Sequence, residues 1–538
     1  MEPRQTEQSI DDFVVPEIAF NTPFVKNAIL ADGDEASPLF AVGEEDVPEL
    51  VEVTVDQLDA QADTMAKLTR QIAVPDELRT PVLTTKESVP VTPSHFIKVE
   101  KNIPEIDRIE RYAGQDADMA EWRAHKHHVM IVSEAGKPIF TRYGDTDAMN
   151  TMMCVIPAVS AFAGQLNQTL NAIKVNGTLH VYVKHGPIYF LIITKTGLPE
   201  LVIRKHTKYY YDQITSALTH VFELMLARRP SYDMRENLTG AAPLISALIR
   251  RSIYDISFTL DALRVCPMPK DPRRDLGDLI TSKRPSTALF AFVTVGRQLV
   301  TAGRPKNVKA LVPGDILILM NTLAVLVQSQ DPNEPVHLRF PICLPNFNRR
   351  GFLYAVTRAL VPGMLCTMLA TKEEACDSLD AALQGMFVIL GDPTRLPLRA
   401  ALVESVASPF YLADTVIEGK RRAPLHFVYV DKVTSQMVGP GFGLELIGRD
   451  EQRRAMLRYQ RIIARSEETQ FGRAMVDSYD DAAVLSWNTK KFRLLVTYAA
   501  DTPPAQMVTV VKELLDWVYR KVDKDRRGEV FILDWPSW

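Results

Sequence analysis

Alternating apolar and polar positions predict two short strands joined by a tight turn over residues 127–144, HHVMIVSEAGKPIFTRYG. Val129 and Ile131 are apolar positions of the first strand, and residues 133–138 contain the Gly and Pro typical of a turn. A helix is predicted directly afterwards, with Asp145 as its N-cap. Its apolar side chains recur every three or four positions, at Met149, Met152, Met153, Ile156 and Val159. This order opens a small module that contains both strands and helices.

Three further strands and a long helix complete the first module. The strands are predicted at residues 172–175, 179–184 and 188–194, with glycines at the turns between them. The helix is predicted over residues 207–228, where apolar positions follow a helical period and Pro230 stops the helix. The sequence therefore predicts five strands and two helices in this module.

The same order of elements returns twice further along the chain. The second copy begins with a strand at residues 288–294 and closes with a helix at 373–386. The third begins with a strand at 425–430 and closes with a helix at 505–522. Each copy spans roughly 80 residues from first strand to last helix, which indicates three repeated α/β modules. The alternative is chance, because strands and helices alternate in most α/β proteins.

The first 122 residues carry a different pattern, without sustained periodicity and with scattered prolines. We predict a disordered acidic tail over residues 1–122, because too little apolar surface is available to offset the entropy of ordering. Short helices are expected at 51–68 and 106–122. Residues 1–60 contain 15 acidic and 2 basic residues, whereas the remainder contains 51 acidic and 60 basic. Our hypothesis is that this tail contacts the basic body loosely and inhibits its activity, and the alternative is a solubilising tail without a regulatory role.

Several classes of function are disfavoured by the composition. The five cysteines form no CxxC pair, and the chain has neither a signal-peptide pattern nor an apolar stretch long enough to span a membrane, so we predict a soluble cytosolic protein. His127 and His128 point to opposite faces of one strand, so they cannot share a metal ion. No catalytic set is recognisable. We therefore predict no catalytic residues, no metal site and no cofactor.

Paired basic residues recur along the chain and suggest an anionic partner. Each pair alone is typical of ordinary solvated surface, but several pairs fall between modules, where they can form one membrane-facing surface. Nucleic acid is a weaker candidate, because the pairs lack interleaved aromatic residues and no recognition motif accompanies them. The predicted lipid-binding residues are Arg273, Arg274, Lys283, Arg284, Lys420, Arg421 and Arg422.

Three stretches resemble one known family. They are residues 126–144, 231–240 (SYDMRENLTG) and 341–352 (PICLPNFNRRGF). Together they are similar to the Mon subunit of the Mon–Ccz complex, the SAND family. The resemblance implies an α/β fold of α+β layers with three longin-like domains, each a five-stranded antiparallel-type sheet with flanking helices. The implied domains follow the tail and span residues 123–270, 271–412 and 413–538.

The resemblance also implies a function in membrane traffic. It implies a heterodimer with a Ccz-like longin subunit that acts as a guanine-nucleotide exchange factor for the late-endosomal Rab GTPase, Rab seven. This role belongs to early-to-late endosome maturation and to vacuole and lysosome fusion. Further implied partners are the early-endosomal Rab GTPase, an anionic phosphoinositide membrane surface and a third scaffold subunit. The implied location is cytoplasmic, with peripheral recruitment to endosomes, late endosomes and vacuoles.

Two other classes of function stay open at this stage. One is a non-catalytic longin scaffold, such as a tethering or coat subunit, and the other is a soluble enzyme with an unrecognised site. Nucleotide exchange itself needs no covalent step, because the exchange factor acts by preferring the nucleotide-free GTPase.

The helix after the first hairpin is the predicted contact with the GTPase and the partner subunit. The alternative for its apolar residues is packing against their own sheet. Pro157 is expected to kink this helix, because it lacks a backbone N–H and clashes with the carbonyl of Met153. Arg339 stands where relatives often carry Trp, so contacts with the early-endosomal Rab are not transferred to this position. The predicted interface residues are Asp145, Asn150, Met153, Ile156, Pro157 and Ser160.

Overall fold

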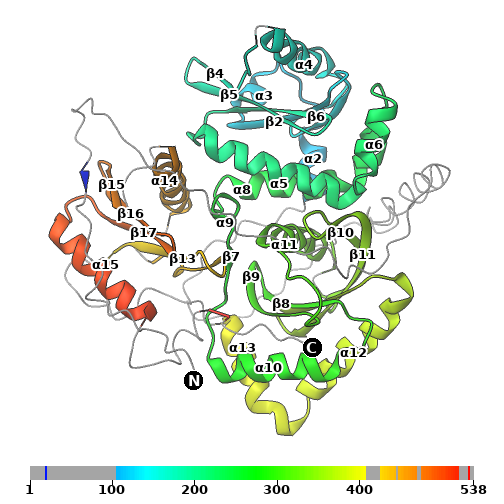
Figure 1. Cartoon of the computed structure of the whole chain (residues 1–538), viewed down its shortest axis with the longest axis vertical. Helices are drawn as coiled ribbons and strands as arrows, with labels where there is room; N and C mark the ends of the chain where they lie inside the picture. The colour runs from blue at the N-terminus through cyan, green and yellow to red at the C-terminus, as the bar shows by residue number, and fades with distance from the viewer. Residues whose placement is uncertain are drawn as a thin grey trace, which may run out of the picture.

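The chain folds into three sheets, each flanked by helices (Figure 1). The computed structural model describes residues 19–20, 105–165, 167–331, 333–407, 424–443, 446, 448–468, 474–519 and 531–532. Most of the predicted acidic tail, including the helix expected at 51–68, lies outside the described residues. The same holds for the basic residues Lys420, Arg421 and Arg422.

The first sheet contains five antiparallel strands in the order β3-β2-β6-β5-β4. Two helices lie on its opposite faces, α4 (Asn150–Gln165) and α5 (Glu200–Leu218) (Figure 1). The strands are β2 (His127–Ser133), β3 (Pro138–Thr141), β4 (Ala172–Val175), β5 (Thr178–His185) and β6 (Ile188–Thr194). The five predicted strands are therefore confirmed, with ends that differ by at most two residues.

Strand β2 is buried on both faces, because helices cover both sides of the sheet. Met130 and Val132 pack with Met153 of α4, whereas Val129 and Ile131 belong to the core on the α5 side. Successive side chains of a strand point to opposite faces, which accounts for this division. An almost continuous apolar run is therefore required here.

The second sheet also has five antiparallel strands, in the order β10-β11-β12-β8-β9. Helix α11 (Pro313–Gln328) packs in the core of one face, and α10 (Lys270–Lys283), α12 (Cys376–Leu390) and α13 (Leu396–Ala407) contribute to the core of the other. The strands are β8 (Phe290–Val295), β9 (Gln298–Gly303), β10 (His337–Leu344), β11 (Asn348–Val361) and β12 (Met364–Ala370). Single turns of 3₁₀ helix precede α12 and α13, at Glu373–Ala375 and Pro393–Arg395.

The third sheet has the order β15-β16-β17-β13-β14, with one short parallel strand added at each edge. These additions are β1 (Ala19–Phe20) beside β15 and β7 (Leu263–Arg264) beside β14. Helices α14 (Arg449–Glu468) and α15 (Pro504–Tyr519) pack in separate cores on its two faces. The five antiparallel strands are β13 (His426–Asp431), β14 (Gln436–Val438), β15 (Ala474–Ser478), β16 (Ala482–Asn488) and β17 (Phe492–Ala499).

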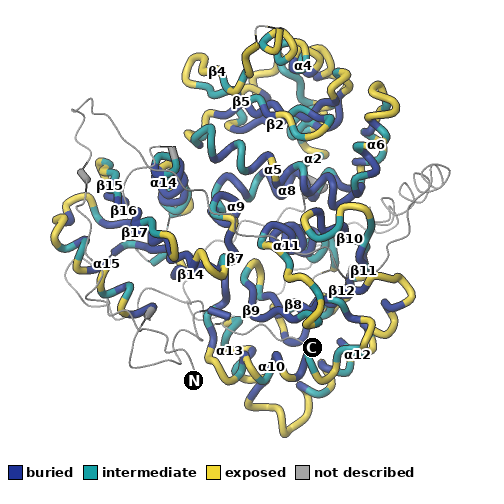
Figure 2. Tube along the Cα trace, viewed as in Figure 1, coloured by how far each residue is buried: buried dark blue, intermediate teal, exposed yellow. Residues whose placement is uncertain are grey.

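A helical segment connects the first domain to the other two. It contains α6 (Val221–Arg228), α7 (Arg235–Leu238), a 3₁₀ turn at Thr239–Ala241, α8 (Ala242–Ser252) and α9 (Ser257–Leu260). Helices α5, α8 and α11 share one hydrophobic core, so the first and second domains are packed together (Figure 2). Strand β7 follows this segment and joins the third sheet. The range predicted for the first domain, residues 123–270, therefore includes a short strand of the third sheet.

Three predicted helices differ from the structure. The helix expected at 207–228 is divided into α5 and α6, because Thr219 adopts a positive φ of 55° between them. The helix expected at 106–122 is also divided, into α2 (Glu105–Tyr112) and α3 (Ala120–Ala124). The helix expected to start at Asp145 starts at Asn150, after a turn in which the Met149 N–H donates to the Asp145 carbonyl.

Candidate functional site

The outward face of α4 is an uncharged surface on the first domain. Met153 and Ile156 are buried against the sheet, whereas Val155 is 53% exposed and Phe162 is 63% exposed. Val155 and Phe162 are seven positions apart, so they lie on one side of the helix, with the exposed Ala158 between them. The helix carries no Asp, Glu, Lys or Arg between Asn150 and Gln165. We call Val155, Ala158 and Phe162 the α4 face.

The six predicted interface residues divide into exposed and buried positions. Asp145 and Asn150 are exposed, and Pro157 and Ser160 are partly exposed. Met153 and Ile156 belong to the core cluster with Met130 and Leu191, with exposed fractions of 0% and 2%. The prediction that these two side chains contact a partner is therefore contradicted, because the helical period places them under the helix. The exposed positions Val155 and Phe162, seven positions apart on the same helix, were not predicted.

Pro157 lies within α4 without ending it, because α4 extends from Asn150 to Gln165. Its ring nitrogen has no hydrogen, so it cannot donate to the carbonyl of Met153. The kink expected at this position stays a prediction.

The first hairpin packs closely against the segments on either side. Gly144 has a φ of +87°, and a Cβ atom there would lie 2.3 Å from the carbonyl oxygen of Gln115. Gly136, in the hairpin turn, has a φ of +82°, and its carbonyl accepts from Cys154 Sγ at 3.3 Å. These two glycines explain why the stretch at 126–144 needs residues without a Cβ at its turn and at its end.

The stretch at 231–240 contacts the turn that precedes α4. Arg235 donates to the carboxylates of Asp233 and Asp147, and its Nη2 lies 2.6 Å from Asp233 Oδ2. The guanidinium lowers the pKa of Asp233 below its usual value through hydrogen bonds and charge. Asp147 lies in the turn just before α4, so Arg235 links α7 to the start of that helix. The role of Arg235 was not predicted, because Asp147 and Arg235 are 88 positions apart.

The histidines near the start of the first sheet belong to an aromatic cluster. The rings of His128 and Trp122 have centroids 3.9 Å apart, and those of His125 and Tyr143 are stacked at 3.7 Å. Burial lowers the pKa of His128 to about 4, so this ring is neutral near pH 7. His127 Nδ1 lies 3.0 Å from Thr194 Oγ1. Among the residues that the structure describes, no group of three or more His, Cys, Asp or Glu residues could hold a metal ion.

Three family models match this chain in order. "First Longin domain of FUZ, MON1 and HPS1" matches residues 127–248, the corresponding second domain matches 286–386, and the third matches 425–522. Together they cover more than half of the 538 residues. The chain is 27% identical over 425 residues to "Vacuolar fusion protein MON1 homolog A" of Gallus gallus, which covers 76% of this chain and 73% of that protein.

The chain belongs to the MON1 (SAND) family. It is also 26% identical over 448 residues to "Protein SAND" of Takifugu rubripes, which covers 82% of this chain and 83% of that protein. For "Vacuolar fusion protein MON1 homolog B" of Homo sapiens the identity is 27% over 431 residues, with 76% and 77% covered. The expected fold of three longin domains is therefore confirmed, and each matched range contains the five antiparallel strands of one sheet.

Arg339, at the position where the resemblance led us to expect Trp, lies on the edge strand β10. Arg339 pairs with Asp377 and Asp380 of α12, with N–O distances of 2.7 Å each. His337 Nε2 lies 3.2 Å from Asp380, and Arg358 also pairs with this carboxylate. Hydrogen bonds from Arg358 and Arg339 hold the pKa of Asp380 well below its usual range. A charged network therefore occupies the edge where relatives were expected to carry Trp.

The basic residues predicted on and after α10 differ in exposure, and one of them is buried. Arg273 is buried, and its guanidinium donates to the carbonyls of Val300 and Cys266 at 2.9 Å each. Burial lowers the pKa of Arg273 to about 10. Arg274 is exposed but pairs with Asp271 at 3.0 Å. The prediction of a membrane-facing cluster is contradicted for Arg273, because one turn of helix places adjacent residues on different sides.

Lys283 and Arg284, at the end of α10, remain accessible to different degrees. Lys283 is exposed and Arg284 is partly exposed.

Within the described part of the chain, no helix is both long enough and apolar enough to cross a membrane.

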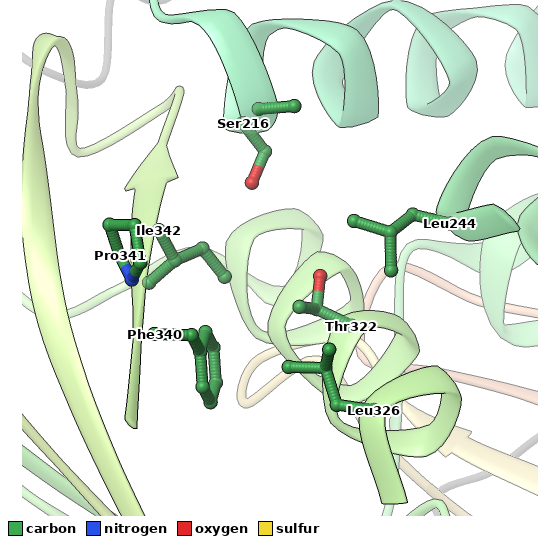
Figure 3. A pocket seen from close by; sticks show the side chains of 8 residues that line it. Ser216, Leu244, Thr322, Leu326, Phe340, Pro341 and Ile342 are labelled. Atoms are coloured by element: carbon green, nitrogen blue, oxygen red, sulfur yellow. The ribbon is translucent and has the colours of Figure 1, made fainter. Parts of the chain in front are cut away.

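A small cavity lies between the first and second domains. It has a volume of about 10 Å³, and the hydroxyl groups of Ser216 and Thr322 point toward it (Figure 3). Leu244 of α8 and Phe340 of β10 are among its other walls. This volume is the size of one water molecule, so the cavity cannot hold a substrate.

Proposed function

We propose that this chain is one subunit of a heterodimeric guanine-nucleotide exchange factor that activates the late-endosomal Rab GTPase, Rab seven, together with a Ccz-like longin subunit. The observation that carries the proposal is the α4 face on the first longin domain. Membership of a family whose relatives are named vacuolar fusion proteins supports the same process, the fusion of vacuolar and late-endosomal membranes.

The α4 face suits a protein partner rather than a small substrate. Large apolar side chains at Val155 and Phe162 are exposed on a helix without charges, so a partner can cover them without desolvating an ion. The strand β4 offers a second surface, because Ile173 is 38% exposed and Val175 is 47% exposed, and among the described residues β4 is the last strand of its sheet. Two such surfaces on one small domain can bind two partners, a GTPase and a second longin subunit.

Exchange on such a surface requires differential binding. To favour the nucleotide-free GTPase by a factor of about 10⁴, the complex must bind that state about 5.5 kcal/mol more tightly. A single helix face is small for this, whereas two paired longin domains can present an interface of standard size, about 1,600 Å². This is why the active species is proposed to be the heterodimer, acting without a covalent step.

Further parts of the proposal concern recruitment. The early-endosomal Rab, a third scaffold subunit and an anionic phosphoinositide membrane are proposed as partners that bring the complex to endosomes and vacuoles. The second candidate function is a non-catalytic longin scaffold or tether, which the same apolar surfaces would also support. The two differ in one property, preference for the nucleotide-free GTPase.

A substitution on the α4 face tests the proposal. Val155→Asp places a charge in the proposed interface and should lower the rate of fluorescent GDP release from Rab seven about tenfold or more when the complex is assayed. Val433→Asp is the matched control, because Val433 is 77% exposed in the turn between β13 and β14. An equal rate for the two variants would contradict the role of the α4 face. Equal binding of loaded and nucleotide-free Rab seven would favour the scaffold.

A further inference from the structure

The turn after α6 exposes a serine that follows two arginines. Arg228 is the last residue of α6, and Arg229, Pro230 and Ser231 come directly after it; all four are exposed. Figure 2 shows this end of α6 as exposed chain at the edge of the molecule. The turn belongs to the segment that connects the first domain to the other two, so it is separate from the α4 face.

The side chains of this turn are available to a partner. Among the residues that the structure describes, Arg228 and Arg229 form no ion pair, and the hydroxyl of Ser231 makes no hydrogen bond. By contrast, Arg235 lies only a few positions further along and pairs with two carboxylates. Two uncompensated guanidinium groups and one free hydroxyl therefore lie together on an accessible turn.

This order of residues occurs at one place in the sequence. The chain contains seven adjacent pairs of arginines, and only the pair Arg228-Arg229 has a serine or threonine two positions after it. Protein kinases discriminate among substrates by the charge pattern around the hydroxyl that they phosphorylate. Two arginines at the third and second positions before a serine are a recognition element for a kinase with an acidic substrate groove, because guanidinium groups form charge-assisted hydrogen bonds with carboxylates.

A similar stretch after α10 provides an internal comparison. Lys283, Arg284 and Pro285 precede the exposed Ser286. Arg284 is only partly exposed there, and its guanidinium donates to the Pro285 carbonyl at 3.5 Å. Burial also lowers the pKa of Arg284. This second stretch presents one accessible cation instead of two, so Ser231 is the better kinase substrate.

Arg235, four positions after Ser231, is the cation that a phosphate on Ser231 would meet within the chain. Its guanidinium makes several contacts with Asp233, with Nε 3.0 Å from each carboxylate oxygen and Nη2 2.6 Å from Oδ2. Its contact with Asp147 uses one nitrogen, Nη1. The side chain of Asp147 is 74% exposed, so water competes for this contact and it is the weaker of the two.

We propose that Ser231 is a phosphorylation site for a kinase that recognises Arg228 and Arg229, and that its phosphate takes Arg235 away from Asp147. In the transfer, Ser231 Oγ forms a bond to the γ-phosphorus of ATP, the bond from that phosphorus to the bridging oxygen of ADP breaks, and the hydroxyl proton passes to a base of the kinase. The product carries about −1.5 to −2 charges near pH 7 and three acceptor oxygens.

The phosphate can reach Arg235 and compete for it. Four residues of chain span at most about 14 Å between Cα atoms, so the ends of the two side chains can meet. A doubly charged phosphate binds a guanidinium more strongly than one exposed carboxylate does. Loss of the contact with Asp147 would release the turn before α4 from α7, and its amide hydrogens should then exchange faster. This inference goes beyond the proposed exchange function and does not depend on it.

Incubation of the full-length chain with ATP and the catalytic subunit of cyclic-AMP-dependent protein kinase tests the site. Mass spectrometry should show phosphate on Ser231 accumulating about tenfold faster than on Ser286. Arg229→Gln should lower the initial rate on Ser231 about tenfold, because one charge-assisted contact with the kinase is removed. Arg274→Gln is the matched control, an exposed arginine of a pair without a following serine. Absence of phosphate on Ser231, or equal rates for these two variants, would overturn the proposal.

Hydrogen exchange of the phosphorylated chain tests the contact with Arg235. Exchange over residues 145–149 should become about threefold faster after phosphorylation, as expected for the loss of one exposed ion pair. Asp147→Asn should show this faster exchange before phosphorylation and no further change after it. Ser231→Ala, treated with the same kinase, should keep the original rate, which excludes effects of other phosphorylated sites. Unchanged exchange over 145–149 in the phosphorylated chain would contradict the competition for Arg235 and overturn the proposal.

Discussion

At the scale of single residues, the sequence predicted the local structure around a residue better than the direction in which its side chain points. Gly136 was placed in a turn, and its φ of +82° agrees with that prediction. Met153 and Ile156 were predicted as contacts, yet both are buried, while the exposed Val155 on the same helix was missed. The reason is that a helical pattern shows which residues share a face and leaves open which face meets the sheet.

Arg273 and Arg274 give the sharpest test at this scale, because adjacent arginines have opposite environments. Arg273→Gln should lower the free energy of unfolding by about 3 kcal/mol, since two buried carbonyls lose a charged donor. Arg274→Gln, at a side chain that is 60% exposed, should change it by less than about 0.5 kcal/mol. Denaturant unfolding measures both values. Similar midpoints for the two variants would contradict the buried role of Arg273.

At the scale of elements, strands were predicted more accurately than helices. Strands β4 and β6 match the predicted ranges to the residue. Several elements were missed altogether, among them helices α8, α10 and α13 and strand β15. The strands of these sheets have apolar runs bounded by Gly and Pro, whereas the break between α5 and α6 falls at Thr219, a residue with no such signal.

The break at Thr219 predicts a stabilising substitution. Its φ of 55° and ψ of −170° lie in a region that only glycine adopts readily. Thr219→Gly should therefore raise the free energy of unfolding by about 1 kcal/mol, after allowance for the lost side-chain packing. Thr215→Gly, one turn earlier in α5, should lower it by about 1 kcal/mol or more. Thermal unfolding of both variants checks the sign, and a destabilised Thr219→Gly would show that its side chain outweighs the backbone strain.

At the scale of the whole molecule, the threefold repeat was predictable and the contacts between its copies were not. The shared core of α5, α8 and α11 joins the first domain to the second. Strand β7 joins the connecting segment to the third sheet. Periodicity predicts which side chains are buried, but it gives no information about which domain buries them. A cavity that Lys205 and Arg493 line could not be predicted for this reason, since its residues come from distant parts of the chain.

Buried histidines distributed over these packed regions predict that the whole chain is sensitive to acid. His128 packs in the first domain, His206 of α5 contacts Thr259 of α9, and His426 lies in the third domain. Burial, the largest cause in each case, lowers their pKa values to about 4, 3 and 3, respectively. Below pH 6.5 the unfolded chain takes up protons that the folded chain excludes. The contribution of these histidines to stability should therefore be constant above about pH 6.5 and should fall below it.

The expected slope is about 1.4 kcal/mol per pH unit for each of these histidines, from pH 6.5 down to the folded pKa. Denaturant midpoints measured between pH 8 and pH 5 would show this loss. His206→Gln should lower stability at pH 8 through lost packing, but its slope below pH 6.5 should be shallower than that of the unchanged chain. That difference in slope is specific to titration, because a purely structural effect would shift the whole curve by a constant amount. Parallel curves for the two proteins would therefore mean that His206 is protonated equally in the folded and unfolded states.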